Sequence, residues 1–253
     1  IRDSSVTGVQ TCALPIFCVG IGLYGMTYVY PRYLAEIRGY NPLMIGETMF
    51  VSGLAMFLAA PLVGRLMNKV DPRYMIGAGL LIFALSTWQM TWITSQYDFY
   101  ELLWPQIFRG LGIMLAMIPV NNIALGTLPP ERMKNASGLF NLTRNLGGAV
   151  GLALINTVLN DRTDLHISRL HDAVNWGNAS AVEMLNMLTQ RFQGQGDAQL
   201  MALKVLWQRV HQQASVMAYA DAFYLLTIFY IGLSLLVVMV KRPKPGAGAG
   251  EAH

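Results

Sequence analysis

Polar and charged side chains interrupt two long apolar stretches near the middle of the chain. The first stretch carries Arg109, Asn121 and Asn122, and the second carries Asn141 and Arg144. Each stretch has about the 20 residues that an α-helix needs to cross a bilayer. Ionisable side chains at membrane depth are costly, so they usually face a bundle interior or a wet cavity. We therefore predict that these five residues line a transport path.

Glycines allow a second interpretation of the same stretch. Gly147, Gly148 and Gly151 contain a small-xxx-small pattern, which lets two helices approach closely. On this interpretation the stretch is a tight helix pair, and its asparagines and arginines are hydrogen-bonding groups between the helices. For any single residue, the sequence alone leaves both interpretations open.

Tyr24 and Tyr28 are the aromatic candidates for the same path, on an earlier apolar stretch that is rich in glycine. Aromatic rings can bind aromatic or cationic compounds through stacking and cation–π contact. The alternative is that both tyrosines pack between helices or lie at the membrane interface.

The sequence carries no pattern of enzyme chemistry. It contains no phosphate-binding loop, no GxSxG, no HExxH and no paired-cysteine metal site. His166 and His171 are five residues apart and share no helix face, so they do not predict a metal site. We therefore expect no catalytic residues, no metal and no cofactor.

The composition is that of a membrane protein. Hydrophobic residues make up 54% of the 253 residues and charged residues only 13%, against about 25% charged residues in soluble domains. The net charge of +4 comes without a long basic run, so no nucleic-acid partner is expected. The lysines and arginines instead gather at the ends of apolar segments, as in multi-pass membrane proteins.

Six apolar segments predict six membrane-crossing helices and an all-α integral membrane fold. They cover approximately residues 17–35, 43–66, 74–94, 101–128, 135–159 and 219–240. A polar segment, 160–218, separates the last two, and apolar residues recur at helical spacing in its second half, which predicts an amphipathic helix. Residues 241–253 form a tail rich in glycine and alanine.

Basic residues in the short connections predict the orientation in the membrane. The connections after the second and fourth helices and the tail together hold eight lysines and arginines, whereas those after the first and third hold only Arg38. Basic short loops stay in the cytoplasm. The C-terminus is therefore predicted to be cytoplasmic, and segment 160–218 to be extracytoplasmic.

The first 16 residues differ from the rest. The run VTGVQTCALPI looks like the in-frame translation of a common sequencing-library adapter, and the chain has no initiator Met. We expect residues 1–16 to be an artefact, with the natural protein continuing upstream of Phe17. The alternative is a short natural amphipathic segment.

Several motifs together resemble one transporter family. They are PQIFRG, LPPER and NLTRNLGGAVG in the central stretch, with LAEIRGYNP, PLVGRLMNKVDPR and QQASVMAYADAF outside it. The set is similar to the second half of 14-helix drug:proton antiporters of the major facilitator superfamily, the EmrB/QacA type, over nearly everything after residue 16. The resemblance implies a six-helix bundle equal to one half of that fold, with the substrate site between the two halves.

The resemblance also implies an activity and partners. It implies export of small hydrophobic or amphipathic drugs in exchange for protons, across the bacterial inner membrane, with lipid around the helices. A periplasmic adaptor protein and an outer-membrane channel often accompany such exporters. A non-transporting membrane scaffold or receptor, or an inactive fragment, is the alternative.

One connection matches a facilitator motif in part. In that family a Gly-x-x-x-Asp-(Arg/Lys)-x-Gly-(Arg/Lys) loop joins paired helices on the cytoplasmic side. The stretch from residue 64 to 73 resembles a degenerate copy, with Asn68 in place of the aspartate. Its candidate residues are Gly64, Arg65, Lys69, Asp71 and Arg73. The alternative is a basic segment that only sets topology.

A proton carrier needs a carboxylate or a histidine within the membrane. Glu47 and Glu101 lie toward the outer ends of their predicted helices, and Asp221 starts the last one. No acid or histidine falls in the middle of a predicted helix, and arginine stays charged. We therefore expect the essential acid in the other half of the transporter, facing Arg109 and Arg144.

Overall fold

The chain folds into helices throughout the part that the structure describes. A computed structural model describes residues 4–125, 130–174, 177–194 and 196–239, and no strand occurs among them. This confirms the all-α fold class for those residues. The helices are α1 (Ser4–Glu36), α2 (Pro42–Leu66), α3 (Pro72–Gln89) followed by the 3-10 helix η1 (Met90–Trp92), α4 (Phe99–Leu125), α5 (Pro130–Ala173), α6 (Ala179–Arg191) and α7 (Ala198–Met239).

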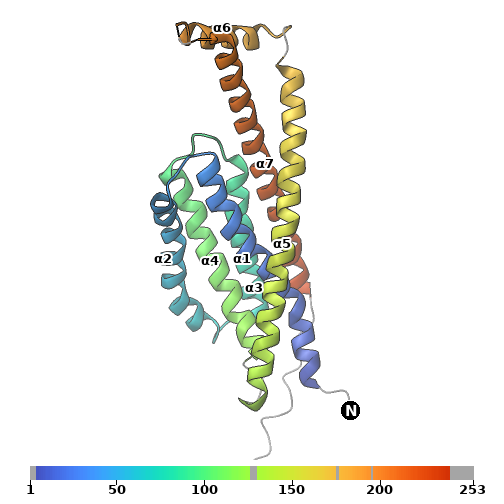
Figure 1. Cartoon of the computed structure of the whole chain (residues 1–253). Helices are drawn as coiled ribbons and strands as arrows, with labels where there is room; N and C mark the ends of the chain where they lie inside the picture. The colour runs from blue at the N-terminus through green and yellow to red at the C-terminus, as the bar shows by residue number, and fades with distance from the viewer. Residues whose placement is uncertain (1–3, 126–129, 175–176, 195, 240–253) are drawn as a thin grey trace, which may run out of the picture.

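Six helices of the described chain, α1 to α5 and α7, pack into one bundle. Helix α1 packs against α5, α3 packs against α4 and α7, and α2 packs mainly against α4. Helices α5 and α7 also pack against each other and run past the end of the others, and α6 lies across their far ends (Figure 1). We call the described residues between 167 and 210 the arm.

Local signals explain where the helices of the bundle begin and end. Gly39 has a φ of +65°, a conformation that favours glycine, directly after the end of α1. The side chain of Asn41 accepts a hydrogen bond from the Met44 N–H (2.9 Å), and Pro42 occupies the first turn of α2. Asp71 and Pro72 start α3 in the same way.

Four helices among the described residues are long and apolar enough to cross a membrane. The spans are Pro42–Leu66, Pro72–Trp92, Phe99–Ile123 and Ala198–Val238. The sequence predicts six, and α1 and α5 are not among these four. Asparagines and an arginine lower the hydropathy of α5. Both helices pack against other helices of the bundle. Their crossing of the membrane stays a prediction.

Two helices are longer than the sequence predicts. Helix α5 continues to Ala173 rather than ending near residue 159, and α7 starts at Ala198 rather than near residue 219. The predicted amphipathic segment and the predicted last membrane helix are therefore one continuous helix. No glycine or proline lies in 152–173 or in 198–231, so nothing in the local sequence breaks either helix where its polarity changes.

Three further predictions concern residues 1–16, the end of α3 and the tail. Helix α1 starts at Ser4 and continues without a break past Phe17, so the structure marks no boundary at the end of the predicted artefact. Helix α3 ends at Gln89, before the predicted end near residue 94, because η1 tightens its last turn. The predicted tail, 241–253, lies outside the described residues.

Glycines bring α1 and α5 into close contact. A Cβ on Gly147 would clash with the backbone carbonyl of Phe17, and one on Gly148 would clash with the ring of Tyr24. A Cβ on Gly151 would lie 2.9 Å from the Cα of Ile21. Only glycine allows this separation of the two helices, so these three residues act in helix packing.

Candidate functional site

A row of polar side chains follows one face of α1 at intervals of four residues. Its members are Tyr24, Tyr28, Arg32 and Glu36, and we call them the α1 row. Side chains four residues apart lie above one another on a helix. All four are at least partly exposed, so they form a polar strip along α1.

Asparagines of α5 pair with the α1 row. The hydroxyl of Tyr24 donates to Asn145 Oδ1 (2.7 Å), and that of Tyr28 donates to Asn156 Oδ1 (3.1 Å). Arg32 also donates to Asn156 Oδ1, at 2.9 Å. The sequence singles out both tyrosines, but it does not predict Arg32 or Asn156 as part of the site.

Arg109 is a buried cation between α4 and α1. Its side chain is only 5% exposed. Its guanidinium donates to Thr27 Oγ1 on α1 (2.9 Å) and to Gln106 Oε1 on its own helix (3.3 Å), and its Nε has no hydrogen-bond partner. No carboxylate of the described residues lies within ion-pair distance of it. Thr27 is the neighbour of Tyr28, so Arg109 reaches α1 beside the α1 row.

Arg144 occupies the other end of the α1–α5 contact. Its guanidinium donates to Asn141 Oδ1 (3.0 Å) and lies 6.0 Å from the centre of the Phe140 ring. Its Nε is buried without a hydrogen-bond partner. Its backbone lies against Gly20, one turn before Tyr24. Arg144 and Asn141 thus continue the polar strip of α1 and α5.

Asn121 and Asn122 lie apart from the other candidates. Asn122 is exposed, and its amide approaches the sulfur of Met67 at 3.2 Å, near the turn between α2 and α3. Asn121 is half-buried. The structure therefore brings Arg109, Arg144 and Asn141 close to the α1 row and places Asn122 near Met67 instead. Asn122 and Asn141 are exposed in this chain, and the prediction that they line a transport path stays a prediction.

A carboxylate at the end of α1 connects three helices, and the sequence analysis misses it. Glu36 accepts from Arg32 Nε (2.7 Å) and from the hydroxyl of Tyr219 on α7 (2.6 Å). Arg32 in turn reaches Asn156 on α5. The signal available in the sequence is the i, i+4 spacing of Arg32 and Glu36, which places opposite charges side by side on a helix.

Asp221 lies within a helix and not at its start. Because α7 begins at Ala198, Asp221 is in its interior, where it accepts from His166 Nε2 of α5 (2.9 Å). Arg162 Nη1 lies 3.7 Å from the same carboxylate oxygen. These three residues form a second ionic group between α5 and α7. Glu47, by contrast, is exposed on α2.

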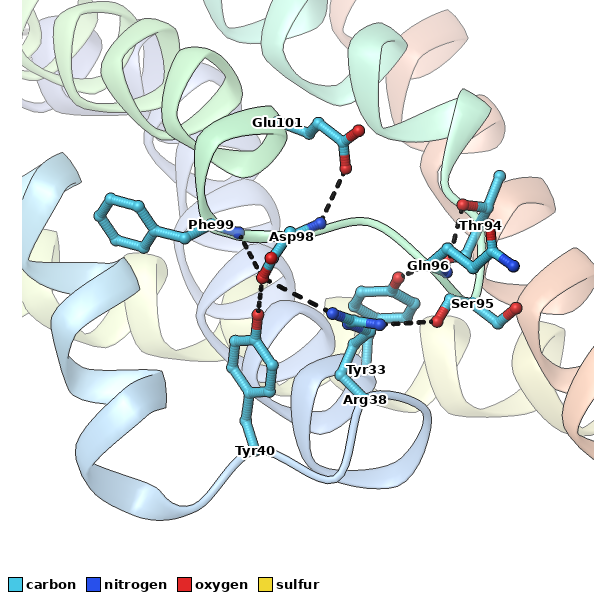
Figure 2. A network of polar contacts seen from close by, with 9 residues as sticks. All are labelled: Tyr33, Arg38, Tyr40, Thr94, Ser95, Gln96, Asp98, Phe99 and Glu101. Atoms are coloured by element: carbon cyan, nitrogen blue, oxygen red, sulfur yellow. Dashed lines mark hydrogen bonds and ion pairs between the residues drawn. The ribbon is translucent and has the colours of Figure 1, made fainter.

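The connections that follow α1 and η1 meet at one end of the bundle. Arg38 donates to the Ser95 carbonyl (2.9 Å) and lies 3.6 Å from Asp98, and Tyr40 donates to the same carboxylate at 2.9 Å (Figure 2). The Asp98 N–H donates to Glu101 (2.7 Å). The hydrogen bond from Tyr40, the amide of Phe99 and the charge of Arg38 hold the pKa of Asp98 below its usual value.

Asp71, one of the candidate motif residues between α2 and α3, has a structural role as a helix cap. Asp71 accepts from the Arg73 N–H (3.2 Å) and so caps α3. Gly64 and Arg65 belong to the last turn of α2, and no neighbour approaches the Cα of Gly64 closely. The assignment of Gly64, Arg65, Lys69, Asp71 and Arg73 to a degenerate cytoplasmic loop motif stays a prediction.

Metal chemistry has no site in the described part of the chain. No group of three or more histidine, cysteine, aspartate or glutamate side chains there could hold a metal ion. The arrangement offers instead hydrogen bonding, cation–π contact and ion pairs along α1, which suit the passage of a solute or a proton.

The sequence of this chain is similar to that of a known protein family. Residues 2–152 match the sequence model of the Major Facilitator Superfamily. The chain is 35% identical to the "Colistin resistance protein EmrB" of Acinetobacter baumannii, over 92% of this chain and 46% of that protein. It is 27% identical to the "Multidrug export protein EmrB" of Escherichia coli, over 100% of this chain and 50% of that protein.

A third relative is named for resistance to fatty acids. The "Fatty acid resistance protein FarB" of Neisseria gonorrhoeae is 27% identical over 90% of this chain and 44% of its own length. The chain thus spans about half the length of the curated relatives that it matches.

Proposed function

The chain belongs to the Major Facilitator Superfamily, and on this premise we propose that it forms the C-terminal half of a proton-coupled exporter of hydrophobic or amphipathic drugs. Facilitators pair two six-helix halves about an axis along the membrane normal, with the substrate between them. The half-length match to proteins named for multidrug export and colistin resistance supports this proposal.

The polar strip formed by α1 and α5 is the observation that carries the proposal. Tyr24, Tyr28 and Arg32 hydrogen-bond with asparagines of α5 and remain partly exposed on this chain. A scaffold helix surrounded by lipid would have an apolar surface at these positions. The other half of the transporter would cover the strip and enclose a path between the halves, where the tyrosine rings bind the drug by stacking and cation–π contact.

Arg109 supports a link between drug and proton. Arginine cannot release its own proton, so it can only bias the protonation of a nearby acid. The guanidinium is buried, and its described partners are the neutral side chains Thr27 and Gln106. The buried Nε has no hydrogen-bond partner among the described residues. We propose that a carboxylate of the other half, or an acidic drug, pairs with Arg109 during the cycle.

Orientation follows from the charged connections. The protein is proposed to lie in the bacterial inner membrane with its C-terminus in the cytoplasm. The loops joined by Arg38 and Asp98 would then face the periplasm, and so would the arm. Within the arm, Leu185 and Leu188 of α6 pack against Ala202 and Leu206 of α7 and give it a small apolar core of its own. An ordered arm on the periplasmic side supports the docking of an adaptor protein that leads to an outer-membrane channel.

Transport by purified protein tests the proposal. The chain joined to the other half of the transporter is reconstituted in vesicles, and a pH gradient drives movement of ethidium as a hydrophobic cationic probe. The joined protein should transport ethidium against its gradient, and residues 17–253 alone should not. Arg109→Gln should abolish gradient-driven transport, whereas Arg209→Gln, at an exposed position of the arm, should not change it.

Three outcomes would contradict the proposal. A joined protein that inserts correctly but moves neither ethidium nor other hydrophobic drugs would favour a scaffold or receptor. Gradient-driven transport by residues 17–253 alone would overturn the assignment to one half. Wild-type transport by Arg109→Gln would remove Arg109 from the coupling.

A further inference from the structure

The α1 row ends, toward the arm, on Glu36, an acid one residue beyond the predicted end of the first helix. We propose that Glu36 binds a proton from the periplasmic side during the transport cycle, and that Arg32 is the residue with which it pairs when the proton leaves. This inference rests on the proposed function, because it assigns a proton-binding residue to this half of that exporter. It adds an acid to the one expected opposite Arg109.

The contacts of Glu36 join three helices through one carboxylate. One oxygen accepts from Arg32 Nε at 2.7 Å, and the other accepts from the Tyr219 hydroxyl of α7 at 2.6 Å. The second end of the Arg32 guanidinium donates to Tyr28 (3.0 Å) and to Asn156 of α5 (2.9 Å). The ionised carboxylate therefore ties α1 to α7 directly and to α5 through Arg32.

Charged and titratable groups around Glu36 come from α1 and α7, two of the three helices that this network joins. Helix α1 supplies Arg32 and Tyr28, and α7 supplies Tyr219. The α5 member of the network is the neutral side chain of Asn156. The other charged groups of this region, Arg162, His166 and Asp221, bond to one another. Arg32 is thus the single cation that holds the Glu36 carboxylate among the described contacts.

Partial exposure gives a proton access to the pair. The side chain of Glu36 is 47% exposed and that of Arg32 is 33% exposed. Glu36 also ends α1 at the face of the bundle from which the arm projects, the face that the proposed orientation turns toward the periplasm. A proton can therefore reach the carboxylate from periplasmic water without crossing the bundle.

Protonation would change the contacts in a defined way. A proton from water binds the Glu36 oxygen that Arg32 holds and neutralises the charge of the carboxylate. The ion pair with Arg32, within α1, is then lost, and the hydrogen bond from Tyr219 of α7 weakens because its acceptor is no longer charged. Arg32 keeps its contacts with Tyr28 and Asn156, so it stays with α5 when Glu36 releases it. When the proton leaves, Glu36 and Arg32 pair again. The outer ends of α1 and α7 are thus held together more strongly in the ionised state than in the protonated state.

Two transport assays on the joined protein separate this role from a purely structural one. Glu36→Gln keeps the shape of the side chain but cannot exchange a proton. It should lose ethidium transport driven by a pH gradient and lose the proton movement that accompanies ethidium. It should keep ethidium counterflow at equal pH on both sides, because that exchange needs no net proton movement. Glu47→Gln, at the exposed carboxyl group of α2, should leave both assays unchanged.

Tyr219→Phe provides a second variant that retains the acid. It removes one donor to the carboxylate and keeps the ring that packs against Tyr33. Gradient-driven transport should persist, with its half-maximal rate moved to a higher external pH, since the ionised form of Glu36 is less stabilised. If Glu36→Gln does not insert into the membrane, Tyr219→Phe tests whether Glu36 binds the proton.

The outcomes distinguish this inference from the proposed function. Wild-type protein that moves no drug in either assay would refute the proposed function itself. Wild-type transport combined with unchanged gradient-driven transport in Glu36→Gln would overturn only the role of Glu36. Loss of counterflow together with gradient-driven transport in Glu36→Gln, or an unshifted pH profile in Tyr219→Phe, would show that the network only holds the helices together.

Discussion

Arginine has two different environments at membrane depth in this chain. Arg109 is almost fully buried and reaches across to Thr27 on α1, whereas Arg144 lies half-buried over the ring of Phe140 and pairs with Asn141. An arginine at the centre of a membrane helix costs about 2.5 kcal/mol or more if it faces lipid. Both residues avoid that cost through polar contacts, but only Arg109 does so within the bundle.

The carboxyl group of Asp98 gives a prediction at the residue scale. Tyr40, the Phe99 amide and Arg38 hold its pKa below the usual value, so its stabilising contribution is present at neutral pH and is lost as the pH falls through the folded-state pKa. Asp98→Asn should therefore lower the melting temperature of the detergent-solubilised joined protein at about pH 7 and have less effect at about pH 3. The effect should be small, since the group is exposed. Equal effects at both pH values would contradict this account.

Helices α5 and α7 show how one element can serve two environments. Each carries an apolar segment and a polar segment without a glycine or proline between them, so the helix continues across the change in polarity. Hydropathy marks where a helix leaves the membrane but not where it ends. This is why the predicted loop, 160–218, is mostly helical in the structure.

Close packing of α1 and α5 gives a prediction at the element scale. Gly147→Ala would place a methyl group against the carbonyl of Phe17, and should lower stability by about 1–3 kcal/mol through overpacking. Gly138→Ala, on the same helix but with no neighbour within 4 Å, should not lower it. Melting temperatures of the purified variants in detergent provide the measurement. Alanine favours a helix more than glycine does, so a similar loss in both variants would contradict the contact with Phe17 as its cause.

The arm gives a second prediction at this scale. Leu188→Asp introduces a charge into the apolar core between α6 and α7 and should disorder the arm while leaving the bundle intact. Drug resistance of whole cells should fall, because the proposed docking of an adaptor needs an ordered arm, whereas transport in vesicles should stay the same. Asn186→Asp, at an exposed position of α6, is the control. Full resistance with a disordered arm would argue against docking there.

At the scale of the whole molecule, the polar strip lies on the outside of the chain and not in a closed cavity. The α1 row and the asparagines of α5 are partly or fully exposed, although α1 packs closely against α5. A surface of this kind fits a protein in which another body of similar size completes the path. This agrees with the half-length match to the relatives.

Accessibility from the two sides of the membrane tests the orientation. In a background without Cys12 and Cys18, Ser180→Cys places a thiol in the arm and Lys69→Cys places one in the connection between α2 and α3. A membrane-impermeant maleimide should label position 180 in intact spheroplasts and position 69 only after permeabilisation. The reverse pattern would invert the proposed topology and place the arm in the cytoplasm.

The sequence by itself determines the class of the protein and the individual candidates. Its composition and apolar segments predict an all-α membrane protein, and its glycines predict the close helix pair. These features depend on local periodicity and local hydrogen bonds, so they can be predicted without the fold. The same local rules single out Tyr24, Tyr28, Arg109 and Arg144 as residues that a plain membrane anchor does not need.

Only the tertiary structure decides which of these residues act together. The pairing of Tyr28 and Arg32 with Asn156, and of Glu36 with Tyr219, joins residues that are more than a hundred positions apart in the sequence. No local pattern predicts such contacts, because they depend on the rotation and relative height of three packed helices. The same packing separates Asn122 from the other candidates and turns an acid at the end of α1 into the centre of a network.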